Sequence, residues 1–358
     1  MPKITITFLS AAASAIERSQ KGTLLLIVRD STTGAAGNHW ELTSVTQIPS
    51  VLTSANKDYI RRAFAGYVNS PRKVIVYAIA SAEDALEAAL EWAALQKFDY
   101  LCGPADIEAS ESAEIASWIE GQRENSDAIF KAVLPNYVAD SEAIVNFATP
   151  SCTLASDGST TLTAAQMCSR IAGILAGTPM RISATYAPMY DLVDCTRLTK
   201  AERDTAVGAG KLIAWYDGTK VKLGRAVNSL TTTTADKSDA FKKIKIMEAI
   251  DMMSADIRDS VAESYIGKYP NTYDNKLLLQ TAISAYFRSL ESDGLIDKGW
   301  SVSIDVDAQK NWLNSHGIST DAMTEQEIKE ANTGTEVFLT VACKPVDAIE
   351  DVTIPIHI

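Results

Sequence analysis

The sequence predicts an α/β fold: a mostly parallel sheet flanked by helices, followed by a helix-rich α+β C-terminal domain, with extended β-strand arms at both termini. Three observations lead to this prediction. Short apolar runs alternate with helix-period segments through the first 150 residues, which is typical of parallel sheets. Long amphipathic helix patterns begin after residue 238. Short segments of strand periodicity stand at both ends of the chain.

The α/β part is predicted from regular alternation of the two element types. Each strand is a short run of β-branched and other apolar residues, and each helix follows a capping or turn residue such as Ser81. The predicted strands are residues 24–29, 73–79, 100–102, 129–134 and 143–148, and the predicted helices are residues 55–67, 82–96 and 112–123.

Residues 151–163 are predicted to be a polar loop, followed by a helix over 164–176. That helix stops at Gly177-Thr178-Pro179, because glycine suits the C-terminal cap and proline prevents continuation. Thr199 with Glu202 three residues later forms a capping-box pattern for another helix. The dipeptide Asp217-Gly218 then predicts a hairpin between strands at 212–216 and 220–227.

From residue 238, apolar residues at spacings of three and four predict a long helix, and a second helix follows over 274–292. Strands are predicted at 300–306 and 336–344, with a polar helical insert between them. The run Thr231 to Thr234 is the expected hinge before this region. We therefore divide the chain into an N-terminal arm (1–20), an α/β domain (21–235), a C-terminal α+β domain (236–346) and a C-terminal arm (347–358).

The two arms carry the clearest signal in the sequence. Ile4, Ile6 and Phe8 alternate with threonines, and the same period of two joins four apolar residues near the other end: Val352, Ile354, Ile356 and Ile358. Two interpretations are open. The strands either complete a sheet in another subunit or fold back as edge strands of their own domain.

Composition narrows the class of protein. The chain has 358 residues, 46% of them hydrophobic and 22% charged, which is typical of a soluble globular protein. No apolar run approaches the length of a bilayer span, and no signal-peptide pattern opens the chain, so we expect synthesis and retention in a cytoplasm. A net charge of −12 argues against a nucleic-acid partner. The five scattered cysteines (102, 152, 168, 195 and 343) are expected to be reduced thiols.

Known catalytic patterns are absent from the sequence. The three histidines, His39, His316 and His357, have no metal-ligand spacing, so packing or surface roles are expected. The segment 208–211 (Gly-Ala-Gly-Lys) lacks the P-loop pattern and is interpreted as a helix C-cap followed by a turn. Asp305 and Asp307 share one face of a predicted strand, where a solvated face is favoured over a cation site. No enzyme activity, cofactor or metal is predicted.

The order of segments resembles the tail sheath proteins of contractile phages and phage-tail-like bacteriocins. The resemblance depends on three stretches: 167–183, with its Ala-Gly-Ile-Leu-Ala motif at 172–176; 198–227, from Leu-Thr-Lys-Ala-Glu-Arg-Asp to Gly-Arg-Ala-Val; and 241–296, with Tyr-Ile-Gly-Lys-Tyr-Pro-Asn at 265–271. It covers more than half of the chain, from about residue 164 onward. The first 150 residues match only in their α/β character.

The resemblance implies a structural subunit that stacks in rings, typically six-membered, wound helically around a tail tube. Terminal arms of this family exchange strands with neighbours, which would give Ile4, Ile6, Phe8, Val352, Ile354, Ile356 and Ile358 inter-subunit roles. Contraction would release a metastable extended lattice without nucleotide hydrolysis. The implied partners are the chain itself, the tube, and baseplate and tail-terminator proteins, with no nucleic acid and no membrane insertion. Assembly would occur in a bacterial host cytoplasm, before incorporation into a virion tail or a bacteriocin particle released by lysis.

The basic cluster Lys242, Lys243 and Lys245 stands out in an acidic chain and is the candidate tube-facing surface; a solvated helix face is the plainer interpretation. An alternative function also stays open. The α/β part could bind a ligand or act as a cytosolic enzyme through a site dispersed over several loops, in which case it would show a saturable ligand and a discrete oligomer.

Overall fold

The computed structural model describes residue 16 and residues 21–81, 85–235 and 237–357. Two compact units divide the described chain: a larger one whose described residues lie within 21–248 and 347–357, and a smaller one that includes 249–346. The predicted N-terminal strand residues Ile4, Ile6 and Phe8, and Ile358 at the other end, lie outside the described residues.

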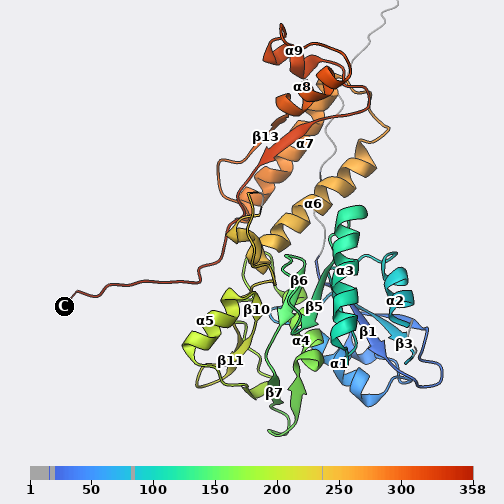
Figure 1. Ribbon diagram of the computed structural model, residues 1–358, viewed down its shortest axis with the longest axis vertical. Helices are drawn as coiled ribbons and strands as arrows, with labels where there is room; N and C mark the ends of the chain where they lie inside the picture. Colours follow the sequence, from blue (N-terminus) through green and yellow to red (C-terminus); the bar gives the residue numbers. More distant parts are fainter. Residues whose placement is uncertain (1–15, 17–20, 82–84, 236, 358) are drawn as a thin grey trace, which may run out of the picture. The chain divides into compact units, whose positions relative to one another are not determined.

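The larger unit is built on a seven-stranded sheet in the order β10-β6-β5-β4-β1-β3-β2. Its strands pair in parallel except β2, which runs antiparallel to β3 at one edge. The predicted parallel α/β sheet is therefore confirmed (Figure 1). The strands are β1 (Thr23–Arg29), β2 (His39–Leu42), β3 (Lys73–Ile79), β4 (Tyr100–Cys102), β5 (Lys131–Pro135), β6 (Ile144–Phe147) and β10 (Lys211–Leu212).

Helices cover both faces of this sheet. Along β1, Leu24, Leu26 and Val28 enter a core shared with α1 (Ser54–Phe64) and α4 (Ala164–Gly177). The alternate residues Leu25 and Ile27 enter a second core with α2 (Ala85–Ala93) and α3 (Ala109–Asn125). A strand that is buried on both faces is expected to be a continuous run of apolar residues, and β1 has such a run.

Two small sheets extend the first of these cores. The predicted loop at 151–163 is wrong, because β7 (Ser151–Leu154) and β8 (Thr161–Thr163) form an antiparallel hairpin, with β9 (Leu192–Cys195) on the other side of β7. Asp157 closes the hairpin turn by accepting hydrogen bonds from the Ser159 and Thr160 amides, both at 3.0 Å. The predicted Asp217-Gly218 hairpin is confirmed as β11 (Ala214–Tyr216) and β12 (Val221–Leu223).

Helix caps follow the sequence. Thr199 and Glu202 form the predicted capping box of α5 (Lys200–Gly208). The helix ends at Gly208, and Gly210 has a left-handed φ of 67°, so this segment is a helix end and turn, as expected. Farther along, η2 (Asp239–Lys242) precedes α6 (Ile244–Ser264), which begins in the larger unit and continues in the smaller one.

The smaller unit combines helices with a two-stranded sheet. Helix α7 (Tyr273–Ser292) is joined to α6 by the Tyr286 hydroxyl, which donates to Asp256 at 2.5 Å. Strand β13 (Ser301–Ile304) pairs antiparallel with β14 (Leu339–Ala342), and the Gln280 side chain of α7 donates to the Val302 carbonyl at 2.9 Å. The insert between the strands holds α8 (Val306–Ser315) and α9 (Glu325–Glu330).

The prediction that Asp305 and Asp307 share a strand face is wrong. Strand β13 ends at Ile304, and Asp305 is the N-cap of α8, where its carboxylate accepts a hydrogen bond from the Ala308 amide at 2.9 Å. Asp307 lies in the first turn of the same helix. Carboxylates are favourable at both positions because they satisfy free backbone N–H groups and face the positive end of the helix dipole.

Candidate assembly interface

The C-terminal segment leaves the larger unit as an extended chain. None of the described residues from 347 onward belongs to a helix or strand, so the interpretation that this end folds back as an edge strand of its own domain is wrong. The side chains of Val352, Ile354 and Ile356 are 69%, 74% and 82% exposed. These residues have the alternation of a half-buried strand and, in the described chain, no surface to bury it against.

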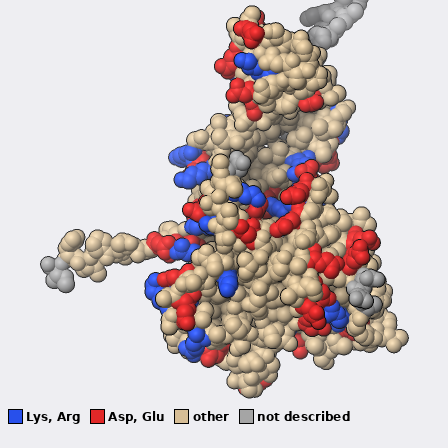
Figure 2. Space-filling view, viewed as in Figure 1, with Lys and Arg blue, Asp and Glu red and all other residues tan. Residues whose placement is uncertain are grey.

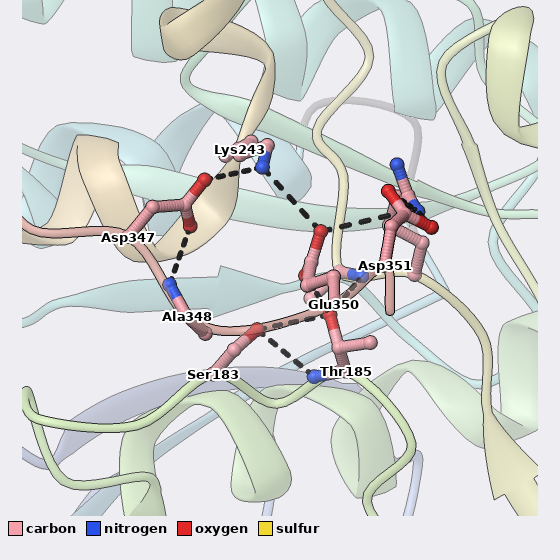
Figure 3. Close-up of polar contacts among 9 residues, drawn as sticks. Ser183, Thr185, Lys243, Asp347, Ala348, Glu350 and Asp351 are labelled. Carbon is pink, nitrogen blue, oxygen red and sulfur yellow. Dashed lines mark hydrogen bonds and ion pairs between the residues drawn. The ribbon is translucent and has the colours of Figure 1, made fainter. Parts of the chain in front are cut away.

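Three acidic residues fix the start of this segment to the larger unit; we call Asp347, Glu350 and Asp351 the acid anchor (Figure 3). Lys243 pairs with Asp347 and lies 3.4 Å from Glu350. Arg225 Nη2 donates to both carboxylate oxygens of Asp351, at 2.6 and 2.7 Å. Figure 2 shows charged side chains of both signs at the base of the segment and uncharged atoms beyond it.

The electrostatics of this contact favour the charged forms of its members. Partial burial alone would lower the pKa of Lys243, but the carboxylates of Asp347 and Glu350 raise it overall. The hydrogen bond to Asp351 likewise raises the pKa of Arg225. Burial alone would raise the pKa of Asp347, and Lys243 lowers it. The contact therefore stabilises the charged forms of Lys243, Arg225 and Asp347.

The basic cluster singled out in the sequence is divided between different contacts. Lys242 pairs with Asp239 at 2.9 Å, and Lys243 binds the acid anchor. The Lys245 residue is 9% exposed, and burial lowers its pKa. Spacing along the chain could not show this, because the partner of Lys243 lies 104 residues away.

The sheet of the smaller unit has open edges. Neither β13 nor β14 pairs with a third strand among the described residues. The side chains of Thr340, Val341 and Ala342 in β14 are exposed. Because a two-stranded sheet is marginally stable and its unpaired N–H and C=O groups can accept a further strand, this sheet is suited to strand addition.

Candidate metal-binding groups do not converge in the described parts of the chain. No cluster of three or more His, Cys, Asp or Glu residues there could hold a metal ion. His39 contacts Trp92, with ring centroids 4.8 Å apart, and His316 stacks on Trp312 at 3.8 Å. A cavity of about 490 Å³ beside the acid anchor contains Lys200, Asp204 and Arg225, but these charges are paired with one another or with the anchor. All five cysteines are free thiols.

Comparison with known proteins assigns the chain to a family. Residues 78–229 match the model of the phage tail sheath protein central domain, and residues 236–358 match that of the phage tail sheath C-terminal domain. The tail sheath protein of Clostridium phage phiCD119 is 39% identical over 359 residues, covering 99% of this chain and 98% of the relative. The chain belongs to the tail sheath protein family.

Solved sheath structures share the fold. The crystal structure of a sheath tail protein from Desulfitobacterium hafniense has a TM-score of 0.73 at 16% identity, covering 96% of this chain and all of that one. The helical sheath of the anti-feeding prophage in its contracted state also has a TM-score of 0.73, at 15% identity, with 99% and 98% coverage. This chain is a structural sheath subunit with the fold of contractile sheaths.

The two family models meet near the predicted domain boundary. The central-domain match ends at residue 229 and the C-terminal match begins at 236, on either side of the run Thr231 to Thr234. The division into compact units lies later, after residue 248 within α6, because the first residues of α6 are buried with the larger unit. In that unit Asp140 accepts hydrogen bonds from the Thr231 and Thr232 amides, at 2.5 and 2.9 Å.

None of the helices in the described chain is long and apolar enough to cross a bilayer.

Proposed function

We propose that this sheath subunit polymerises helically around a tail tube through exchanged terminal strands, and that its lattice contracts from a metastable extended state to drive the tube into a target cell. The observation that carries the proposal is the exposed apolar alternation of Val352, Ile354 and Ile356 in a chain that also presents an incomplete sheet, β13–β14. The C-terminal arm has the pattern of a strand but no sheet to join, and the β13–β14 sheet of another subunit has an edge that can accept a strand.

The other details follow from the family and remain part of the proposal. Subunits would form six-membered rings stacked around the tube, because head-to-tail contacts that do not close produce a helical lattice. Ile4, Ile6, Phe8 and Ile358 would complete the exchanged strands, and the C-terminal domain would form the inner layer, with the domain boundaries given above. Baseplate and tail-terminator proteins would bind the two ends of the cylinder.

We further propose that the subunit performs no catalysis, binds no nucleic acid and does not insert directly into membranes. The energy of contraction would come from the difference between two lattice states, with a kinetic barrier holding the extended one. Assembly would take place in the bacterial host cytoplasm, and the finished virion tail or bacteriocin particle would be released by lysis.

The test replaces two arm residues by charges, in the double variant Ile354→Asp with Ile356→Asp. Because both side chains are exposed in the single subunit, the melting temperature should stay within about 2 °C of the parent. Regular hollow cylinders, seen by negative-stain electron microscopy of the full chain with its tube protein, should be lost, since charged side chains disfavour burial in a neighbour's sheet.

Ile266→Asp is the matched control, because Ile266 is 69% exposed and lies outside both arms. It should leave the cylinders intact. Cylinders formed by the double variant at the parental yield would contradict strand exchange. Discrete small particles from the parent chain, even when concentrated with its tube protein, would contradict the sheath lattice itself.

A further inference from the structure

At the start of the C-terminal arm, a charged side chain is buried while neighbouring apolar residues are exposed. The charged side chain of Glu350 is only 7% exposed, whereas its apolar neighbours Ile349 and Val352 are 90% and 69% exposed. A carboxylate is costly to bury unless cations and hydrogen-bond donors compensate it. The fold therefore provides a built site for Glu350, while it leaves the adjacent apolar groups in water.

Three side chains from distant parts of the larger unit form that site. The Thr185 hydroxyl accepts the Ala226 amide at 3.0 Å and donates to Glu350 Oε1 at 2.6 Å. On the other carboxylate oxygen, Oε2, Arg225 Nε lies at 3.5 Å and Lys243 Nζ at 3.4 Å. One hydroxyl and two cations thus converge on a single buried carboxylate (Figure 3).

The two acids that flank Glu350 bind the same two cations. Lys243 also forms an ion pair with Asp347, and Arg225 Nη2 donates a hydrogen bond to Asp351. Isolated surface ion pairs contribute little to stability, but here each cation bridges two carboxylates around a buried centre. Loss of one cation would leave Glu350 buried and undercompensated, which favours release of the whole segment.

We propose that the acid anchor is an ion-pair clamp that fixes where the C-terminal arm leaves its own subunit and thereby sets the distance at which a second copy of the chain can accept it. This inference builds on the proposed strand exchange. With the clamp closed, the free arm is residues 352–358, whose seven residues span at most about 23–25 Å. The accepting sheet edge of the second copy therefore lies within that distance of Asp351.

Opening the clamp would lengthen the arm. The next fixed point toward the N-terminus is Val346, whose amide donates to the Leu295 carbonyl at 2.9 Å. The free segment would then be residues 347–358, which span at most about 40–43 Å. The clamp thus restricts the arm to little more than half of the reach that its length allows, which favours one lattice spacing over others.

The first experiment measures the clamp without any assembly. In the non-assembling background Ile354→Asp with Ile356→Asp, a glutamate-specific endoprotease is used and the C-terminal peptide released by cleavage after Glu350 is followed by mass spectrometry. The clamp shields Glu350, so cleavage there should be slow in the background. Lys243→Glu should accelerate it at least about tenfold, because local opening governs access of the protease.

Two further variants make this result specific. Lys344→Asp reverses the charge of a lysine whose side chain is 82% exposed, near the arm but outside the clamp, without adding a glutamate, and cleavage after Glu350 should not change. Arg225→Asp should accelerate cleavage as Lys243→Glu does, because it removes the cation shared by Glu350 and Asp351. Equal cleavage rates in the background and in Lys243→Glu, with unchanged melting temperatures, would overturn the clamp.

The second experiment examines reach in the assembling chain. Lys243→Glu without the arm substitutions should give few or irregular cylinders, although its melting temperature stays near that of the parent. Regular cylinders at the parental yield would overturn the role of the clamp in setting the reach. If the parent chain forms no cylinders, the proposed strand exchange fails, whereas the cleavage rates still decide whether the clamp exists.

Discussion

At the scale of single residues, buried carboxylates organise the larger unit. Asp30, which is 1% exposed and directly follows β1, accepts hydrogen bonds from the Thr53 amide at 2.7 Å, the Thr32 amide at 3.0 Å and the Asn56 side chain at 2.9 Å. Burial alone would raise the pKa of Asp30, but these donors hold it well below its usual range. The carboxylate thus joins the end of β1 to the N-cap of α1.

Asp30→Asn should therefore cost about 1–3 kcal/mol of unfolding free energy at pH 7, because an amide cannot accept all three hydrogen bonds. The cost should depend on pH. A carboxylate whose folded pKa is depressed contributes fully above its unfolded pKa of about 4, and the contribution is lost as pH falls toward the folded value. Urea unfolding at pH 7 and below pH 4 measures this, and a difference between parent and variant that stays constant with pH would contradict it.

Several residues of the acid anchor contact could be singled out from the sequence, but the residues that they bind could not. It singled out Lys243 as part of a basic cluster and 347–358 as an arm, but not that the two are joined. Thr185 carried no signal, and Arg225 stood out only as part of the Gly-Arg-Ala-Val motif, with no role assigned to its side chain. Contacts between residues 104 to 165 positions apart depend on the complete fold, and local periodicity holds no information about them.

At the scale of elements, small residues allow helix α4 to lie close to α1. A Cβ atom built on Gly173 would lie 2.0 Å from the Ala63 carbonyl oxygen of α1, a distance at which something must move. The Ser169 hydroxyl of α4 donates to the Tyr59 carbonyl at 2.7 Å across the same contact. The Ala-Gly-Ile-Leu-Ala motif that suggested the family is thus a packing motif.

Gly173→Ala should lower the unfolding free energy by about 1–3 kcal/mol, the usual cost of overpacking, and a rigid carbonyl as the clashing group favours the upper end. Gly121→Ala is the control within another helix, because its added Cβ meets nothing nearer than an Asn125 nitrogen at 4.0 Å. It should stabilise by roughly 0.5–1 kcal/mol through helix propensity. Chemical denaturation measures the unfolding free energies of both variants, and equal values would contradict the close contact between α4 and α1.

Elements with long buried apolar runs could be predicted from the sequence, whereas a polar hairpin could not. Strand β3 was predicted to the residue, since its apolar run is buried on both faces and bounded by turns. The β7–β8 hairpin was missed because Ser, Thr and Asp dominate it and only Cys152 and Leu162 are buried. Asp305 was misassigned because an N-cap and a strand end look alike when a strand leads directly into a helix.

At the scale of the whole molecule, membership of the sheath family makes it possible to test whether the basic cluster faces the tube. We infer that Lys242 is the member of the cluster that can face the tube, because Lys243 binds the acid anchor and Lys245 is largely buried. Lys242→Glu should reduce co-sedimentation of the sheath with its tube by roughly threefold or more, with a larger effect at low salt, as for a charge at an interface rim.

Lys200→Glu provides the comparison for that prediction, since Lys200 also pairs with an acid on its own helix, Asp204 at 2.5 Å, and belongs to α5, outside the basic cluster. Equal co-sedimentation of the two variants would remove Lys242 from the tube-facing surface. Melting temperatures of both should match the parent, which separates loss of binding from loss of folding.

The acid anchor also orders events during synthesis. Lys243 and Arg225 leave the ribosome well before Asp347 and Asp351, which follow them by 104 and 126 residues. At translation rates of about 5–20 residues per second, that interval is roughly 5–25 seconds. The parallel sheet, whose last strand is β10 at Lys211–Leu212, can close within this time. A nascent subunit would therefore complete this sheet before its C-terminal arm can bind a neighbouring subunit.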